Sequence, residues 1–329
     1  MATIRDIAHE AGVGISTVSY VLNKTGLQKV SEKTRKRIIA VAKELNYVPN
    51  IAGKALRQGK TYNVAVLFPN ISGSFAHWII AGIEDELNKF QYSMLFCKYR
   101  SSEEFVEKCR LLIGKQIDGV IIHKALDSKT ASEIVKLNRK HPVVMLAHPQ
   151  TVQDIPSVHV DGETVNRLMV QHLIENGHRR IAVQCHDSES RKNGAESAIP
   201  GTDTKLYFVP TTIRKGKDLL EWLLAHPEKP TAVSAYSDDV AFELIGAAYD
   251  RGIRIPEDLS VVGCDGDDFG ALIRPALTSV KQPDIEQGGE AVRLLLKKIE
   301  NGNAESVILQ PELLSRASVA DLNIKERIK

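Results

Sequence analysis

The stretch TIRDIAHEAGVGISTVSYVL, residues 3–22, decides how the N-terminal part of this 329-residue chain folds. Thr3 and Asp6 have the spacing of a capping box, in which the two side chains satisfy free N–H groups at a helix start. Apolar residues then follow at helical spacing up to a glycine turn, and a second such pattern covers residues 15–22. A third helix is expected after Ser31, which is a good N-cap residue. Three short helices with a glycine turn between the first two predict a helix-turn-helix module.

The second helix of such a module enters the major groove of DNA, so its early exposed side chains face the base edges. Ile15 is expected to contact a thymine methyl group, and Ser16 to donate or accept a hydrogen bond. Thr17 and Ser19 are better placed to meet phosphates. The alternative is a bundle that only packs together, although about fifty residues would be marginally stable alone. The predicted DNA-binding residues here and in the following segment are Thr3, Ile15, Ser16, Thr17, Ser19, Tyr20, Asn23, Asn50, Gly53 and Leu56.

The charge of the chain is unevenly distributed. The whole sequence has a net charge of +2, from 43 Lys and Arg against 41 Asp and Glu. Residues 1–60 alone carry eleven basic and four acidic residues, a net charge of +7, which leaves −5 for the remainder. A small basic module joined to a larger acidic body is typical of a nucleic-acid-binding protein with a second function. A short segment that is basic by chance is the alternative, and charge alone does not exclude it.

Several protein classes are disfavoured. No apolar run approaches the roughly 20 residues of a membrane helix, and no signal-peptide pattern follows the N-terminal charges. The four cysteines form no CxxC pair, which argues against a disulfide scaffold or a cysteine zinc site and is typical of a reducing cytoplasm. His186, Asp187 and Ser188 are adjacent, and neighbouring residues do not face one another as a catalytic triad requires. The ten histidines lack HExxH spacing. We expect no catalytic residues, metal site, cofactor or membrane association.

From residue 63 onward, short apolar runs alternate with amphipathic stretches. The predicted strands are residues 64–68, 94–97, 119–122, 143–146, 181–183, 207–209, 232–235 and 260–262. The clearest helical patterns are residues 75–90, 163–175, 240–250 and 285–299. This β-α alternation predicts parallel sheets with helices on both faces, and about 265 residues of it favour two doubly wound lobes over one. The expected fold is a small all-α helix-turn-helix head plus an α/β body of two doubly wound parallel-sheet lobes.

Five segments in a fixed order make this sequence similar to a known family. They are IRDIAHEAGVGISTVSYVLN (4–23), VSEKTRKRI (30–38), LNYVPNIAGKALRQGKT (45–61), PEDLSVVGCDG (256–266) and PALTSVKQP (275–283). The chain resembles the LacI/GalR family of bacterial transcription regulators over essentially its whole length. The resemblance implies a cytoplasmic, nucleoid-associated homodimer that represses transcription from a pseudo-palindromic DNA operator under the control of a small-molecule effector. It also implies a body like periplasmic sugar-binding proteins, with three crossovers between the lobes and the ligand in the cleft.

A hinge is expected between the head and the body. Pro49 cannot continue a helix and marks the end of the head. The resemblance implies that residues 50–57 form a short helix that orders on operator DNA and packs against its copy in the dimer. Leu56 matches a leucine that wedges into the minor groove, a device that kinks DNA. Gly53 weakens this helix by roughly 0.8–1 kcal/mol relative to alanine. The alternative is an ordinary solvated linker.

The sequence departs from the family pattern at several positions. Gly14 stands where a serine usually caps the second helix, and Tyr20 stands where an arginine is common, so the operator sequence is not carried over. The first pocket loop, residues 70–76, lacks the usual Asn-Pro-Phe-Phe, and Ala147-His148 replaces a frequent Asp-Arg. These departures favour a phosphosugar or another metabolite over a conventional free sugar, with control by a protein corepressor as the alternative.

Ligands of doubly wound folds bind beyond the carboxyl ends of the strands, so candidate pocket residues directly follow strands. Asp265 matches the family's carboxylate that holds polar groups of the ligand, and Ser237-Asp238 takes the place of an Asn-Asp pair. Arg191 matches an arginine used on ligand hydroxyls or carboxylates. Aromatic residues after the first strand would suit a sugar or purine ring. Each of these residues could instead be a helix cap or part of a structural ion pair. The predicted effector-binding residues are Phe75, Trp78, Arg191, Ser237, Asp238 and Asp265.

The predicted division of the chain follows from these segments. It comprises a helix-turn-helix domain (1–48), a hinge (49–60) and an effector-binding and dimerisation core (61–329). Within the core, the first lobe is expected at about 61–160 and 285–318, and the second at about 161–284 and 319–329. The tail after residue 320 is polar and lacks leucine heptads, which predicts a dimer and not a tetramer.

Overall fold

The computed structural model describes residues 2–23, 27–47, 59–69, 74–123, 128–146, 152 and 154–323. The chain divides into two compact units, Met1–Thr61 and Tyr62–Lys329. The predicted hinge residues Asn50, Gly53 and Leu56 lie outside the described residues, as do Ala147 and His148. No helix within the described ranges is both long and apolar enough to cross a membrane.

The N-terminal unit contains the predicted helices. They are α1 (Ile4–Glu10), α2 (Ile15–Leu22) and α3 (Glu32–Glu44), with a short 3-10 helix η1 (Leu27–Lys29) before α3. Thr3 caps α1 in a capping box with Asp6, and the Ser31 side chain caps α3. One fully buried side chain comes from each helix: Ile7, Val18 and Ile38. The helix-turn-helix prediction is therefore confirmed, and we call helices α1 to α3 the head.

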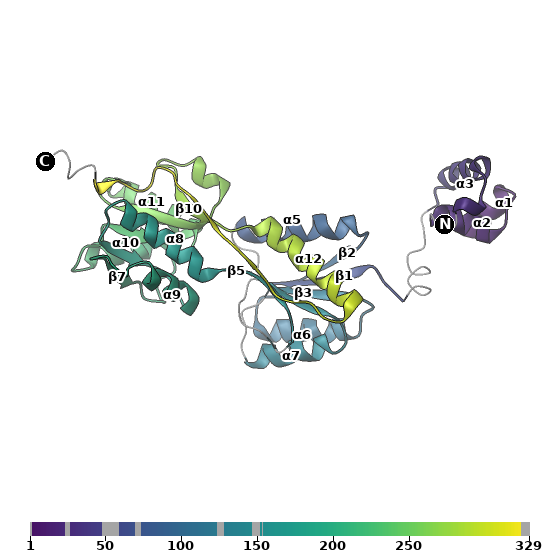
Figure 1. Ribbon diagram of the computed structural model, residues 1–329, viewed down its shortest axis with the longest axis horizontal. Helices are drawn as coiled ribbons and strands as arrows, with labels where there is room; N and C mark the ends of the chain where they lie inside the picture. The colour runs from purple at the N-terminus through teal and green to yellow at the C-terminus, as the bar shows by residue number, and fades with distance from the viewer. Residues whose placement is uncertain are drawn as a thin grey trace. The chain divides into compact units, whose positions relative to one another are not determined.

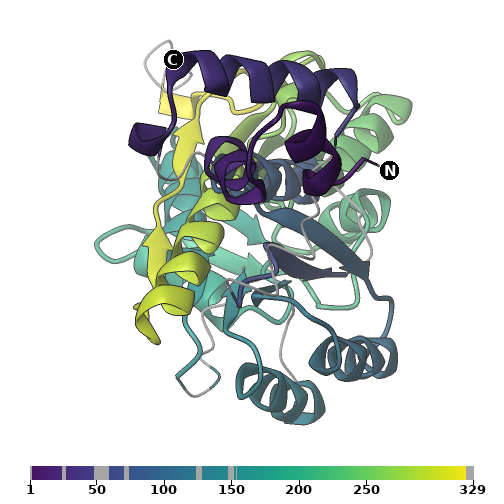
Figure 2. The same ribbon diagram turned by 90° about the vertical axis from the view of Figure 1, so that its right-hand side faces the viewer.

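The first lobe of the larger unit is built on a six-stranded parallel sheet in the order β11-β5-β4-β3-β1-β2. Its strands are β1 (Asn63–Phe68), β2 (Ser93–Lys98), β3 (Gly119–His123), β4 (Val143–Leu146), β5 (Ser157–Val160) and β11 (Val307–Leu309). Its helices are α5 (Ser74–Lys89), α6 (Ser102–Ile113), α7 (Ser128–Asn138) and α12 (Asp284–Asn301). Alternate residues of β1 pack toward α5 and α12 on one side and toward α6 and α7 on the other. Figures 1 and 2 show these helix pairs on opposite faces of the sheet.

The second lobe has a sheet of the same size in the order β12-β10-β9-β8-β6-β7. Its strands are β6 (Arg180–Val183), β7 (Lys205–Phe208), β8 (Ala232–Ser234), β9 (Ser260–Asp265), β10 (Thr278–Lys281) and β12 (Glu312–Leu314). Its helices are α8 (Gly162–Glu175), α9 (Glu189–Ser197), α10 (Gly216–Ala225), α11 (Asp238–Asp250) and the 3-10 helix η2 (Asp268–Ala271). Helices α8 and α9 cover one face, and α10 and α11 cover the other (Figure 1). The two predicted α/β lobes are confirmed, except that the edge strand β12 is antiparallel to β10.

Three connections join the lobes: β5 to α8, β10 to α12, and β11 to β12. The last of these corrects the predicted division of the body, because β12 pairs with β10 of the second sheet. Ser318 also hydrogen-bonds to the backbone of Val261 and Thr278 in that lobe. Residues 312–318 therefore belong to the second lobe, not to the first. The sequence could not place the connection from β11 to β12 correctly. Each strand has only three residues, which is too short for its hydrophobic pattern to show that the two strands belong to different sheets.

Candidate functional site

Helix α2 presents apolar side chains to solvent on its outer face. Val18 and Val21 point into the core of the head, whereas Ile15 is 50% exposed and Tyr20 is 36% exposed. Ser16 is also exposed. An isoleucine and a tyrosine on the outside of an eight-residue helix leave apolar surface that a binding partner can cover. Ile15, Ser16 and Tyr20, which the sequence predicts to face bases, are thus exposed on this helix.

The polar residues around α2 differ in how far they are free to bind. The backbone N–H and the hydroxyl of Thr3 each lie 2.8 Å from Asp6 Oδ2, so the Thr3 side chain is held in the cap of α1. The Asn23 amide donates to the Ser19 carbonyl at 2.9 Å and lies 3.1 Å from the Ser19 hydroxyl. Gly14 begins α2 without a side-chain cap, as the sequence predicts, and thus leaves the first N–H groups of the helix without a side-chain acceptor.

A cavity of about 590 Å³ lies beside the crossovers and is lined from both lobes. We call it the cleft. Trp78 of α5 lines it from the first lobe, and residues 265–268, which follow β9, line it from the second. Residues 281–286, which lead from β10 into α12, complete most of the remaining wall, together with Gln310 and Glu312. Of the predicted effector-binding residues, the cleft brings together Trp78 and Asp265.

Asp265 ends β9 in a strained conformation. Its φ of 125° lies in the region that favours glycine, and such strain is often found at functional sites. Its Oδ1 accepts a hydrogen bond of 2.9 Å from the Gln282 side chain. Burial, together with the nearby charge of Asp238, raises the pKa of Asp265 to about 7, although the Arg191 guanidinium acts in the opposite direction. The carboxyl group of Asp265 therefore carries a proton part of the time near neutral pH.

Ser237 and Asp238 lie outside the cleft wall, and Asp238 hydrogen-bonds to the cleft residue Asp267. Ser237 is the N-cap of α11. Asp238 is buried, and its two carboxylate oxygens accept hydrogen bonds from the Ser279 hydroxyl at 2.6 Å and the Asp267 N–H at 2.7 Å. A Cβ atom on Gly263 would come within 2.1 Å of Asp238 Oδ1, so this packing requires the glycine. Both predicted residues thus have structural bonds, and neither lines the cleft.

Arg191 and Phe75 are also held by neighbours in the interior. Arg191 Nη1 donates to the Tyr236 carbonyl at 2.7 Å, and its guanidinium lies 4.3 Å from the centre of the Tyr236 ring. Arg191 Nη2 is 3.3 Å from Cys264 Sγ. Phe75 packs against the core of the first lobe, 6.1 Å from the His123 ring. Neither side chain is part of the described cleft wall.

Asp284 is a residue of the cleft that the sequence analysis missed. It is the first residue of α12, it is only 7% exposed, and it lines the cleft. Burial, together with the charge of Asp265, raises the pKa of Asp284 to about 8. The criterion of a polar residue just after a strand applies to Asp284, but the strand before it was not predicted. Thr278 and Ser279 are polar and yet fully buried, so β10 lacks the apolar pattern of its neighbours.

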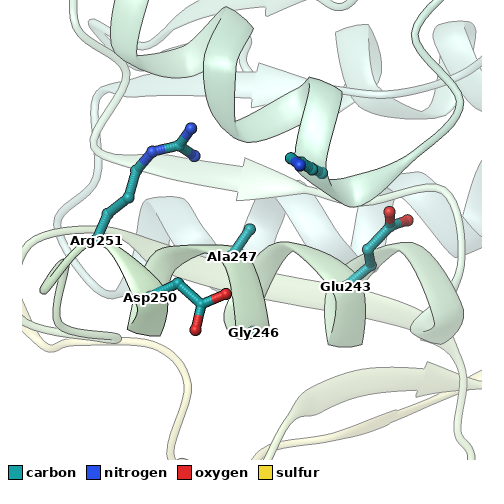
Figure 3. Close-up of a pocket in the computed structure, with 6 residues that line it drawn as sticks. Glu243, Gly246, Ala247, Asp250 and Arg251 are labelled. Carbon is teal, nitrogen blue, oxygen red and sulfur yellow. The ribbon is translucent and has the colours of Figure 1, made fainter.

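A second hollow, of about 520 Å³, lies on the second lobe between α10 and α11 (Figure 3). Glu243 and Asp250 of α11 and its C-cap residue Arg251 surround it with charges of both signs, and Gly246 leaves its floor open. Arg251 is paired with Glu221. None of the predicted site residues lies there, so the cleft remains the better ligand site.

Comparison with known proteins relates both units to one family. Residues 3–50 match the family described as bacterial regulatory proteins, lacI family, and residues 170–319 match the periplasmic binding protein-like domain. The chain is 34% identical over 322 residues to the catabolite control protein A of Priestia megaterium, which covers 94% of this chain and 96% of that protein.

Solved structures give the same relationship. The chain is similar to the Lac repressor dimer bound to operator and the anti-inducer ONPF, with a TM-score of 0.81 and 25% identity over 97% of this chain and 99% of that one. It is also similar to the transcriptional regulator CelR in complex with cellobiose, with a TM-score of 0.70 and 27% identity over 97% and 100% of the two chains.

Proposed function

Because the chain belongs to the lacI family of bacterial regulatory proteins, we propose that it represses transcription by binding a pseudo-palindromic operator as a homodimer. The observation that carries this proposal is the outer face of α2, where Ile15, Ser16 and Tyr20 are exposed on a basic unit. Residues 1–60 carry a net charge of +7, which suits a phosphate backbone. We assign Thr17, Ser19 and Asn23 to the edge of this DNA-binding surface.

Two copies of the head would read two half-sites, because a two-fold symmetric protein matches a two-fold symmetric operator. The similarity to a Lac repressor dimer bound to operator supports this assembly. The second lobe also exposes two apolar side chains, Phe269 in η2 and Leu272 directly after it. A second copy of the chain could cover this apolar surface. We infer that the protein acts as a dimer at cytoplasmic, nucleoid-associated DNA.

The cleft is the proposed site of a small-molecule effector. Trp78 and Asp265 line it from the two lobes, so a ligand there contacts both lobes at once. An effector that binds one arrangement of the lobes more tightly shifts the population toward it and changes the order of the hinge. The cellobiose in the related CelR structure supports a sugar or a related metabolite. We assign Asp238 to positioning the cleft wall. The comparisons do not support the alternative of a protein corepressor.

Homologues of this chain are transcriptional regulators, and we infer that it is not an enzyme. The tripeptide at 186–188 supports this inference, because its members have different partners. The His186 ring meets the Tyr236 ring edge to face, Asp187 pairs with Arg214, and Ser188 caps α9. These contacts do not form a nucleophile, base and orienting acid in series.

A gel-shift titration of the full chain on a genomic fragment library, at 50 and 200 mM salt, tests the proposed function. A protein with 6–10 phosphate contacts loses about 10³–10⁵ in affinity over this range. Ile15→Ser should then lower affinity for the selected operator by roughly tenfold or more, because it removes an apolar base contact. Ile39→Ser is the matched control, since Ile39 is equally exposed (52%) but lies on α3. Absence of DNA binding, or equal losses in the two variants, would contradict the proposal.

A further inference from the structure

The described lining of the cleft has an excess of negative charge. Asp265 and Asp284 line it together with four more acidic residues, whereas Lys281 is the single cation of the described lining. Lys281 is exposed to solvent, and Arg191 behind Asp265 is held by the Tyr236 carbonyl and ring. One cation therefore faces each carboxylate, Arg191 at Asp265 and Lys281 at Asp284, whereas the described lining holds six acidic residues.

Asp284 is the more exceptional of the two carboxylates. Asp265 accepts a hydrogen bond from Gln282, but the carboxylate of Asp284 makes no hydrogen bond to any described residue. Only 7% of the surface of Asp284 is accessible to solvent, and yet the residue forms part of the cleft wall. A buried charge without a partner is costly, and such groups are normally paired or protonated. The free carboxylate thus faces the space that a ligand would fill.

We propose that the effector of this cleft carries a positively charged organic group, a primary ammonium, that binds between the carboxylates of Asp265 and Asp284. This inference rests on the proposed function, because it specifies the chemical class of the ligand in the same cleft. The indole of Trp78, which lines the cleft opposite the second lobe, adds an aromatic surface on which a cation is favoured.

An organic cation fits these residues better than the other ligand classes. A neutral sugar would leave Lys281 as the single cation among the six acidic residues of the described lining, and an anionic phosphosugar would add repulsion. A metal ion needs several ligands at once, and the described residues contain no group of three or more His, Cys, Asp or Glu arranged to hold one. An ammonium group needs only two or three acceptors, because it is a compact donor of three hydrogen bonds.

The titration of Asp265 and Asp284 supports the same class of ligand. Burial raises the pKa of Asp265 to about 7 and that of Asp284 to about 8, so protons occupy the pair at neutral pH. The charges that face them are Asp238 and Arg191 for Asp265, and Lys281 for Asp284. A bound ammonium group would take the place of these protons. Its binding should therefore release protons at pH 7 and become tighter as the pH rises from 6 to 8.

Calorimetry and thermal shift on the full chain, with pairs of compounds that differ only in an amine or a hydroxyl, test this inference. The pairs are glucosamine and glucose, putrescine and 1,4-butanediol, and ethanolamine and ethylene glycol. At least one amine should stabilise the protein more than its hydroxyl partner, with proton release measured in two buffers of different ionisation enthalpy. Asp284→Asn should weaken that amine by at least about thirtyfold, because a desolvated charge pair is lost.

Glu286→Gln is the matched control, because Glu286 lines the same turn of α12 but is exposed. It should change amine affinity by less than about threefold. The inference is overturned if no amine stabilises the protein, if a hydroxyl compound binds as tightly as its amine, or if both variants lose affinity equally. Retained operator binding in the gel shift then separates failure of this inference from failure of the proposed function.

Discussion

The head and the cleft place their functional groups in opposite environments. In the head, apolar Ile15 and Tyr20 lie in solvent, whereas in the cleft the carboxyl group of Asp284 is buried and that of Asp265 is half-buried. Each arrangement is unfavourable for the free protein and becomes favourable when a partner of matching chemistry binds. The difference teaches that the candidate functional residues of this chain are those whose polarity does not fit their surroundings. The head holds its residues with contacts that are local in sequence, and the cleft holds its residues with contacts that are distant in sequence.

The contacts that build the head are local, whereas those that build the cleft are distant in sequence. Eight consecutive residues form α2 and present its whole outer face. The cleft needs Trp78 from α5, Asp265 from the end of β9 and Asp284 from the start of α12. Damage to tertiary packing should therefore destroy the cleft and leave the head intact.

Gly288→Ala is the strongest test of this difference. Helix α12 approaches α5 so closely that a Cβ atom on Gly288 would lie 2.2 Å from the Ile79 carbonyl oxygen and 2.8 Å from the Ile83 nitrogen. Both atoms are backbone, so the helices must separate, and we expect a loss of about 3 kcal/mol or more in the free energy of unfolding. Urea unfolding followed by the fluorescence of Trp78 and Trp222, the two tryptophans of the chain, measures the larger unit alone.

Gly246→Ala is the control for that substitution. Gly246 lies within α11, and a Cβ atom there would meet nothing within 4 Å. Alanine should stabilise this helix by about 0.5–1 kcal/mol, because it restricts the unfolded chain and has a better helix propensity. If both variants behaved alike, close helix packing would not be what holds the cleft walls in place.

Leu56→Ala tests the segment between the two units. The family resemblance gives this leucine the role of a minor-groove wedge, and its structure lies outside the described residues. We expect affinity for the operator to fall roughly 10- to 100-fold, since the kinked DNA loses its apolar wedge. Binding to non-specific duplex should change far less, because it depends on phosphate contacts. Competition gel shifts measure both, and an equal loss on the two DNAs would remove the wedge role.

The same contrast explains how far the sequence could predict the structure. Thr3, Asp6 and Ser31 revealed the helix starts of the head because a cap is specified within four residues. In the body, the apolar strands were predictable from alternation, and the place of Asp265 in the cleft wall was predictable from its position at the end of a strand. Strand β10 and hence Asp284 were not, because buried Thr278 and Ser279 gain their partners from residues far away in sequence.

The stability of the two units should respond differently to pH. Folding raises the pKa of Asp265 and of Asp284 above the ordinary value of 3.8, to about 7 and about 8. The folded core then binds more protons than the unfolded chain, so its stability falls as the pH rises toward 8. Desolvation lowers the pKa values of half-buried His159 and His186, which act in the opposite direction, mainly below about pH 6.5.

Thermal unfolding of the core from pH 6.5 to 8.5 measures this effect. The midpoint should fall by several degrees, at about 2–4 °C per kcal/mol, and Asp284→Asn should reduce the fall. In the head, hydrogen bonds from Thr3 lower the pKa of Asp6, so the head should not lose stability in this range. The interpretation would be wrong if the unfolding midpoint of the core rose with pH. It would also be wrong if the midpoint of Asp284→Asn fell with pH as steeply as that of the unsubstituted protein.

Gly14→Ser should give the smallest effect and acts on the head alone. Gly14 has φ −68° and ψ 150°, an extended conformation open to any residue, and the nearest atom to a new Cβ would be Ser16 Oγ at 3.7 Å. The serine hydroxyl could accept from a free N–H at the start of α2, which should stabilise the head by a few tenths of a kcal/mol. Gly12→Ser is the contrasting variant, since Gly12 has φ +58° and a side chain there is strained. Amide hydrogen exchange in α2 should slow in the first variant and quicken in the second, while the tryptophan-detected midpoint of the core stays unchanged. A shift of that midpoint in either variant would mean that the head and the core do not unfold independently, and the separation between local and distant contacts would then fail.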